Sequence, residues 1–230
     1  MERTLGRQEA SDAVGDEGWR LLLGTLRTSV RVGSLAEAAG VAARAVAVCG
    51  DDADGHLRVD LRPEQVVLSL QSLDRAALTA RDVDLARRLT AAVRAAGLRT
   101  EPGVGTGASR SVQVLEIAVD ALDIPAIRPF WAAVLGYAGE AGADGPADPL
   151  VDPAGEGPAF WFQQMDRPRP QRNRIHFDIC VPHDEAPGRL EAALAAGGRL
   201  LSADRAPAFW VLADPEGNEA CITTWQGRDG

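Results

Sequence analysis

Two histidines stand where an imidazole could take part in proton transfer or in ligand binding. His56 lies two residues after Asp54, and His176 lies two residues before Asp178. An imidazole, whose unperturbed pKa is about 6.5, both accepts and donates a proton at neutral pH. Residues 175–181 read IHFDICV, an alternating pattern that predicts a strand with His176 and Asp178 on one face. The sequence therefore offers two candidate sites, one in each half of the chain.

The elements that would position His176 are repeated along the second half of the chain. Residues 208–225 read AFWVLADPEGNEACITTW, two apolar runs separated by a turn with Pro and Gly, which predicts a hairpin. Residues 150–165, LVDPAGEGPAFWFQQM, have the same ingredients. An alternating strand and a helical pattern precede each hairpin, at residues 112–119 and 124–135 and again at residues 175–181 and 186–196. The second half therefore predicts two copies of one unit.

This order resembles the paired βαβββ modules of the vicinal oxygen chelate (VOC) superfamily, the glyoxalase and bleomycin-resistance fold. Four blocks carry the resemblance: FWAAVLGY at 130–137, FWFQ at 160–163, NRIHFDICV at 173–181 and LADPEGNEACI at 212–222. The resemblance implies a cavity that takes a small molecule. In metal-dependent members it also implies a divalent metal, held by residues from the first strand and a late strand of each module.

The resemblance places residues of this chain at the four metal positions, namely Glu116, Gln163 or Gln164, His176 and Cys221. Glu116 and His176 are the candidate metal ligands, and both are also candidate catalytic residues. Neutral Gln is a poor ligand, and Cys221 stands where a metal-binding member usually has Glu. A divalent metal is therefore a candidate cofactor, with a metal-free site as the alternative.

Trp161 and Trp210 occupy corresponding places in the two predicted modules. One interpretation is a pocket for a flat ligand, to which Gln163 and Asp178 add polar contacts. The other is that both rings are core side chains, because large rings dominate buried area. Both interpretations stay open at the level of the sequence.

The first half predicts a smaller α+β unit. A strand pair bends near Gly24, and Ser34 with Glu37 is typical of a capping box for a helix over 35–48. Two alternating strands follow with a break near Pro63, and Thr79 with Asp82 predicts the start of a helix that ends near residue 96.

This half resembles the pterin-4a-carbinolamine dehydratase family, in which helices cover one face of a four-stranded antiparallel sheet. The residues that carry the likeness are Gly18 with Trp19, residues 54–66, and AALTARDVDLA at 76–86. The resemblance implies a lyase that removes water from a pterin carbinolamine, such as 4a-hydroxytetrahydrobiopterin. The positions that match the family are Asp51, Asp54, His56, Arg81 and Asp82, of which Asp54, His56 and Arg81 are the catalytic candidates.

The histidine motif of that family is incomplete in this chain. Its His-His-Pro run reads Gly55, His56, Leu57, and a further family histidine falls on Leu73. Dehydration protonates a leaving hydroxyl and removes a proton from a ring nitrogen, and neither Gly55 nor Leu73 can do either. Weak dehydratase turnover is expected. The alternative is that His56 is a polar strand residue and Asp82 only caps a helix, so that this half serves as a scaffold, a dimerisation element or a binder of another ring. A homodimer is therefore a candidate assembly.

The composition of the chain limits the kinds of molecule that it is expected to bind. The net charge of −9 and the sequence pI of about 4.9 argue against sequence-blind binding of nucleic acid or anionic membranes, which requires clustered positive charge. No apolar run approaches the roughly 20 residues of a membrane helix, and residues 1–17 lack the apolar core of a signal peptide. The three widely spaced cysteines give no disulfide framework. A cytoplasmic protein with a small-molecule ligand is expected.

The predicted fold class is α+β in two domains. The predicted boundaries are a polar segment at 1–17, a dehydratase-like domain at 18–99, a glycine-rich linker at 100–111 and a VOC domain at 112–228. The predicted function is that of a glyoxalase-like protein that binds or acts on a small ring-bearing metabolite, with lyase or isomerase chemistry. The alternatives are a pterin carbinolamine dehydratase and a non-catalytic protein that sequesters a small molecule.

Overall fold

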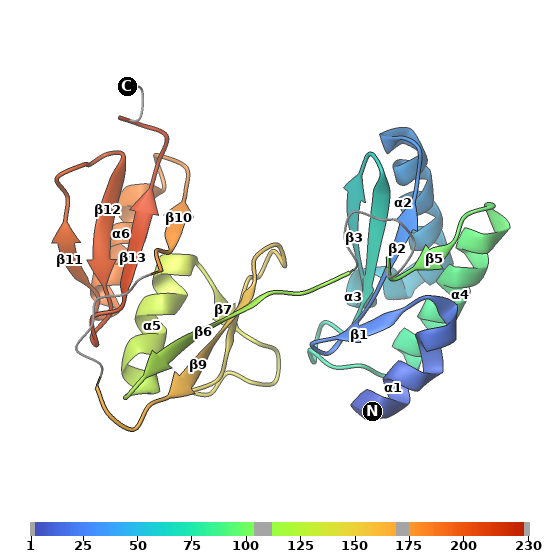
Figure 1. Ribbon diagram of the computed structural model, residues 1–230, viewed down its shortest axis with the longest axis horizontal. Helices are drawn as coiled ribbons and strands as arrows, with labels where there is room; N and C mark the ends of the chain where they lie inside the picture. Colours follow the sequence, from blue (N-terminus) through green and yellow to red (C-terminus); the bar gives the residue numbers. More distant parts are fainter. Residues whose placement is uncertain (1–2, 104–111, 169–174, 228–230) are drawn as a thin grey trace. The chain divides into compact units, whose positions relative to one another are not determined.

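The structure, a computed structural model, describes residues 3–103, 112–168 and 175–227. The chain divides into two compact units, Met1–Val114 and Leu115–Gly230, each with its own buried core and sheets (Figure 1). The predicted α+β class with two domains is confirmed. Within the described ranges, no helix has the length and apolar character needed to cross a membrane.

The first unit is an antiparallel sheet with helices packed against it. The strands follow the order β1-β2-β4-β3, and β5 pairs with β2. Their bounds are β1 Arg20–Leu22, β2 Thr25–Arg31, β3 Leu57–Arg62, β4 Gln65–Leu70 and β5 Thr100–Glu101. The helices are α1 Arg7–Val14, α2 Leu35–Cys49 and α4 Ala80–Ala95, and the short helical turns are η1 Gly15–Glu17, η2 Gly50–Asp52 and α3 Ala53–His56.

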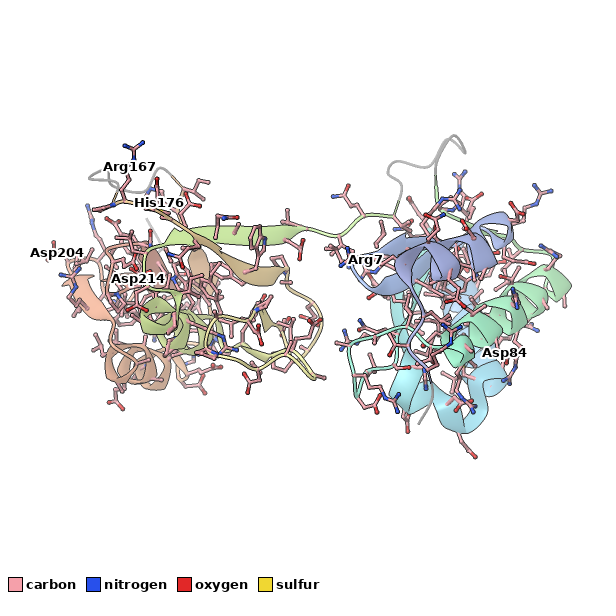
Figure 2. All side chains as sticks on the ribbon, turned by 90° about the horizontal axis from the view of Figure 1, so that it is seen from below. Arg7, Asp84, Arg167, His176, Asp204 and Asp214 are labelled. Carbon is pink, nitrogen blue, oxygen red and sulfur yellow. The ribbon has the colours of Figure 1, made fainter. Side chains whose placement is uncertain are left out.

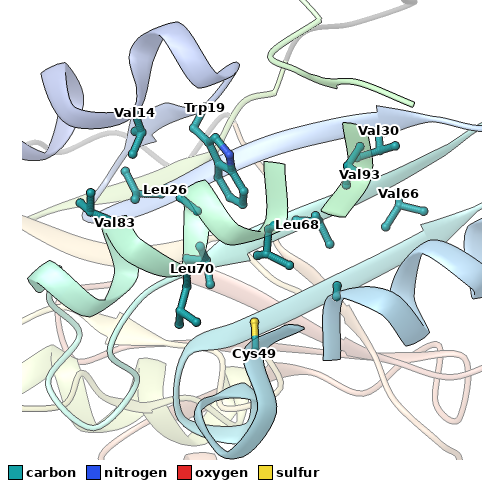
Figure 3. Packing of buried hydrophobic residues seen from close by; sticks show 14 of the residues in the cluster. Val14, Trp19, Leu26, Val30, Cys49, Val66, Leu68, Leu70, Val83 and Val93 are labelled. Carbon is teal, nitrogen blue, oxygen red and sulfur yellow. The ribbon is translucent and has the colours of Figure 1, made fainter. Parts of the chain in front are cut away.

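The core of the first unit lies between the sheet and these helices. Alternate residues of the central strands enter it, including Leu26 of β2 and Leu68 of β4, both fully buried (Figure 3). The ring of Trp19 is also fully buried, and its Nε1 donates a hydrogen bond of 2.9 Å to Thr90 Oγ1 on α4. This bond satisfies the one polar atom of the indole, so the large ring can stay in the core.

Both predicted helix starts are present. Ser34 Oγ accepts a hydrogen bond from the Glu37 amide at 3.2 Å, but the Glu37 carboxylate accepts from the Gly33 amide at 2.6 Å rather than from Ser34. At α4 the capping box between Thr79 and Asp82 is complete in both directions. Each carboxylate thus binds an amide at the amino-terminal end of a helix, where the helix dipole also favours negative charge.

The structure differs from the sequence prediction at both ends of the first unit. Residues 7–14, predicted to belong to a polar segment outside the domain with room for a short helix, do form a helix, α1, but it buries Ala10 and Val14 in the core of the first unit. A spacing of four residues puts these two small side chains on one helix face, a signal too short to stand out in a polar sequence. Thr100 and Glu101, predicted as linker, pair with β2 as β5. Most of the predicted linker, residues 104–111, lies outside the described residues.

The second unit contains two four-stranded sheets of identical topology. The first is ordered β6-β9-β8-β7 and the second β10-β13-β12-β11, and in each the first strand runs parallel to the last. The first module consists of β6 Glu116–Ala121, α5 Ile124–Leu135, β7 Ala138–Gly139, β8 Leu150–Val151 and β9 Ala159–Gln164. The second consists of β10 Asp178–Cys180, α6 Ala186–Ala195, β11 Arg199–Ser202, β12 Phe209–Ala213 and β13 Glu219–Thr223. The predicted pair of βαβββ modules is confirmed.

Two local predictions for strands were wrong. The strand predicted for residues 112–119 begins at Glu116, and residues 112–115 belong to no strand. The stretch before β3, predicted as part of a strand, forms the helical turn α3. Residues 112–115 continue the apolar alternation but pair with no strand, whereas residues 51–56, DDADGH, have no such alternation.

The repeated Asp-Pro turns have the same hydrogen bonds in both modules. The carboxylate of Asp152 accepts from the amides of Ala154 and Glu156, and that of Asp214 accepts from the amides of Glu216 and Asn218. Each aspartate therefore binds the amides two and four residues later. This side-chain chemistry explains why the DPxG pattern recurs in the sequence.

The turn after β12 also joins the two modules. Asp214 is fully buried, and its Oδ2 accepts from Trp131 Nε1 on α5 at 3.0 Å and from Asn218 Nδ2 at 2.8 Å. The neighbouring Glu216 carboxylate accepts from the amides of Leu122 and Asp123 at the start of α5. In Figure 2 Asp214 lies within the unit, whereas Asp204 lies at its edge. One turn of the second module is thus bonded to the helix of the first.

The buried contacts predict a large effect of Asp214→Ala on stability. The substitution leaves the Trp131 indole and the turn amides without their acceptor, which should lower the free energy of unfolding of this unit by about 3 kcal/mol. The measurement is calorimetry of the full chain at neutral pH. Asp204→Ala, at an exposed position, is the matched control. Equal shifts of the two variants would show that the Asp214 contacts do not support the fold.

Candidate functional site

A cavity of about 630 Å³ lies on the face of the second-module sheet opposite the core. Along β13, Glu219, Cys221 and Thr223 line the cavity, whereas Ala220 and Ile222 are buried in the core. This is the alternation expected of a strand with one face packed and one face open. The volume lies within the range of small-molecule sites in proteins.

His176 and Asp178, which the sequence selected, both line this cavity. Asp178 is the first residue of β10 and stands opposite Cys221 of β13, and His176 lies just before that strand. Both side chains are exposed, and Figure 2 places His176 at the periphery of the unit. The predicted common face of these two residues is therefore present.

Sequence reasoning missed several residues of the same cavity, among them Arg205, Phe209 and Thr223. Trp210, selected from the sequence as a ligand contact, packs instead against the core cluster of the second unit. The reason is the parity of β12: Phe209 pairs with Thr223 and Trp210 with the core residue Ile222. The sequence carried no signal for this, because the run FWVLA at 209–213 is apolar at every position.

The predicted residues of the first module lie on the other sheet and do not line this cavity. Glu116 begins β6, and Trp161 and Gln163 belong to β9, with Trp161 half-buried and the other two exposed. Glu116 lies close to the half-buried Glu140. Burial raises the pKa of the Glu140 carboxyl, and the nearby charge of Glu116 raises it further.

In the first unit, His56 is held by a buried carboxylate. Its Nδ1 lies 2.8 Å from Oδ1 of Asp82, a fully buried residue that also accepts from Ser72 Oγ at 3.0 Å and from the Thr79 amide at 2.8 Å. An ionised carboxylate can only accept hydrogen bonds, so this contact assigns the imidazole proton to Nδ1. Nε2 is then the acceptor, and the described residues provide no partner for it.

The other two catalytic candidates of this unit do not contact His56. Asp54 lies exposed on α3, and Arg81 Nη1 donates to Asp52, at 2.8 Å, in an exposed ion pair. The hydrogen-bond partner of His56 is thus Asp82, which the sequence had marked as a family match and as a helix cap.

Family models match the chain in two places. Residues 3–92 match the model for pterin 4 alpha carbinolamine dehydratase, and residues 116–223 match that for a glyoxalase-like domain. The chain carries one domain of each kind. None of the curated proteins matches it.

Solved structures of both kinds are similar to parts of the chain. A glyoxalase/bleomycin resistance protein/dioxygenase family enzyme from Burkholderia phytofirmans PsJN is 18% identical over 47% of this chain and 95% of its own, with a TM-score of 0.39. A glyoxalase-related enzyme from Fulvimarina pelagi is 21% identical over 49% of this chain and 87% of its own, with a TM-score of 0.39. A transcriptional coactivator/pterin dehydratase from Brucella melitensis is 20% identical over 39% and 98%, with a TM-score of 0.35.

The motif positions of the dehydratase-like domain come together although two of the three histidines are absent. The Leu73 amide donates to the Gly55 carbonyl at 2.9 Å, and the Gln71 amide donates to the His56 carbonyl at 3.0 Å. The positions that read Gly55, His56 and Leu73 therefore lie beside one another. A Cβ added to Gly55 would meet no atom within 4 Å. The backbone of the motif is therefore held together, but His56 is the one histidine left at its positions.

The glyoxalase-like domain does not assemble the metal ligands that the resemblance implies. Across residues 3–103, 112–168 and 175–227, no group of three or more His, Cys, Asp or Glu side chains is arranged to hold an ion. Glu116 is on β6 beside Glu140, and His176 lies before β10 of the other sheet. These residues do not fit a resident divalent metal, and no chemical step is assigned to one.

The raised pKa of Glu140 predicts a dependence of stability on pH. The folded state holds this proton more tightly than the unfolded state, so stability is lost as pH rises from the ordinary carboxyl value of about 4.3 through the raised value. Glu140→Gln should therefore lose less stability than the wild type between about pH 4 and pH 7. The measurement is chemical unfolding at both pH values, with the exposed Glu156→Gln as control. A wild-type pH dependence in Glu140→Gln would contradict the assignment.

Proposed function

We propose that the glyoxalase-like domain binds a small, ring-bearing metabolite in the cavity of its second module. The observation that carries the proposal is the cavity itself, about 630 Å³ in volume, with an apolar wall and several polar side chains. Phe209 and Val211 give the wall a surface on which a ring can pack, and His176, Asp178 and Arg205 supply hydrogen-bonding groups. Binding without chemistry would make the chain a sequestering protein.

The same cavity is suited to lyase or isomerase chemistry if its ligand has an acidic C–H or a leaving group. His176 is an exposed imidazole that lines the cavity, and imidazole is the side chain that most often serves as a general acid or base. Asp178 is the second proton-transfer candidate on the same face. A sequestering protein and a lyase or isomerase must both bind the ligand, so binding is the property to test first.

His176→Ala should weaken the binding of cavity ligands by about tenfold, because it removes one hydrogen-bonding group worth roughly 1.4 kcal/mol. Thermal stability should stay near that of the wild type, because the exposed His176 side chain has no recorded contact in the core. The measurement is saturation-transfer NMR of the full chain with a set of mono- and bicyclic heteroaromatic compounds, followed by titration of those that bind.

His183→Ala is the matched control, because His183 contacts Trp225 and does not line the cavity. Two results would contradict the proposal: no binding by any compound of the set, or equal weakening by the two histidine variants.

A second function, dehydration of a pterin carbinolamine by the dehydratase-like domain, is favoured by the contact between His56 and Asp82. This contact orients the imidazole and leaves Nε2 as a proton acceptor. Gly55 and Leu73 supply no further proton-transfer group, so the reaction would depend on one histidine.

Turnover of 4a-hydroxytetrahydropterin should accordingly lie close to the spontaneous rate, since each missing acid or base costs about 10²-fold or more. The measurement is the rate of dehydration with the full chain against a protein-free control. A rate far above that control, and abolished by His56→Ala, would show that the single histidine suffices.

We infer a cytoplasmic setting from the free thiols. Cys49 is buried, Cys180 is exposed and Cys221 is buried, and none is in a disulfide. A reducing compartment keeps an exposed thiol such as Cys180 from oxidation. The association of two chains through the dehydratase-like domain stays a prediction.

A further inference from the structure

Two carboxylates and one guanidinium, those of Asp178, Glu219 and Arg205, line the cavity, and Asp178 and Arg205 lie at opposite corners of its floor. Asp178 on β10 and Val211 on β12 both stand opposite Cys221 of the intervening β13, so two strand spacings, about 10 Å, separate them. Arg205 precedes β12, and its carbonyl accepts from the Ala208 amide at 2.8 Å and the Phe209 amide at 3.3 Å. These bonds fix the Arg205 backbone at the start of β12, away from Asp178 along the strand as well as across the sheet.

Neither Asp178 nor Arg205 is paired with an opposite charge in the described part of the protein. No ion pair or side-chain hydrogen bond of Asp178 or of Arg205 is present among residues 3–103, 112–168 and 175–227. A guanidinium presents a planar fork of N–H donors that matches a carboxylate, and a carboxylate matches an ammonium or amidinium. Each corner of the cavity is therefore ready for a ligand group of opposite charge.

Thr223 adds a hydroxyl to the cavity lining at the end of β13 that pairs with the start of β12. It is 3% exposed, lines the cavity and stands opposite Phe209, the first residue of β12. Within the described ranges its hydroxyl has no hydrogen-bond partner. The hydroxyl is not a buried unpaired atom; it is open to the cavity and can donate to a ligand oxygen there.

We infer that the cavity is built for a dipolar ligand, a ring-bearing molecule with a cationic nitrogen at one end and a carboxylate at the other. The nitrogen faces Asp178, the carboxylate faces Arg205 and the Thr223 hydroxyl, and the ring lies over Val211 and Phe209. This inference rests on the proposed function, because it names the class of ligand for the same cavity. The Asp178 carboxylate and the Arg205 guanidinium lie on opposite sides of β13 and do not pair with each other. Each can therefore pair with one end of the ligand.

The test compares four probes on the full chain by isothermal titration. The dipolar probe is 4-(aminomethyl)phenylacetate. Its relatives are 4-methylphenylacetate, without the ammonium; 4-methylbenzylamine, without the carboxylate; and 4-methylbenzyl alcohol, with neither charge. The dipolar probe should bind about tenfold more tightly than either singly charged probe.

Charge-removing variants then assign each end. Arg205→Gln should make the dipolar probe bind no better than the amine, and Thr223→Val should weaken only the two carboxylate-bearing probes. Asp178→Asn should make the dipolar probe bind no better than 4-methylphenylacetate. The matched controls are Arg199→Gln and Asp184→Asn, exposed residues outside the cavity lining, and they should leave the order of the probes unchanged.

The outcomes separate the two levels of the proposal. If none of the four probes binds, both the ligand cavity and the dipolar ligand are overturned. If all four bind equally, or if Arg205→Gln and Asp178→Asn leave the preference for the dipolar probe intact, the cavity binds ligands but the dipolar assignment is wrong.

Discussion

The glyoxalase-like domain depends on the carboxylate of Asp214. A fully buried carboxylate would strongly destabilise the fold if it had no partners, and this one accepts hydrogen bonds from the Trp131 indole and from the Glu216 and Asn218 turn. The same turn sets the register of β12 against β13. That register decides that Phe209 and Val211 face the cavity while Trp210 faces the core. The shape of the binding surface therefore follows from a polar contact on the opposite side of the sheet.

The dehydratase-like domain contains a similar solution around Asp82. One buried carboxylate caps α4 through Thr79, binds Ser72 and orients His56. Structural and chemical roles are thus combined in a single residue. From the sequence, Asp82 was a helix cap and a family match; the structure has the cap and also the contact with His56, which was not predicted.

The sequence predicted the elements best where a local signal defines them. Helix α5 begins and ends where expected, because Asp123 caps its start and Gly136 adopts a left-handed conformation at its end. That His176 and Asp178 line the same face was also predictable, since alternation is a local property, although β10 itself begins only at Asp178. That Arg205 and Thr223 line one cavity was not predictable, because Arg205 lies in the turn between β11 and β12, where no strand alternation assigns it to a face.

The backbone around His56 has a consequence for how this domain could change. Gly55 and Leu73 are hydrogen-bonded to each other, and Gly55 has open space where a side chain would stand. The motif is held in place by Asp82 and by backbone hydrogen bonds. These contacts do not depend on which side chains stand at positions 55 and 73. In evolutionary terms, the domain stands two substitutions from a full histidine set, and its framework would accept the first of them without displacing a neighbouring atom at the Cβ.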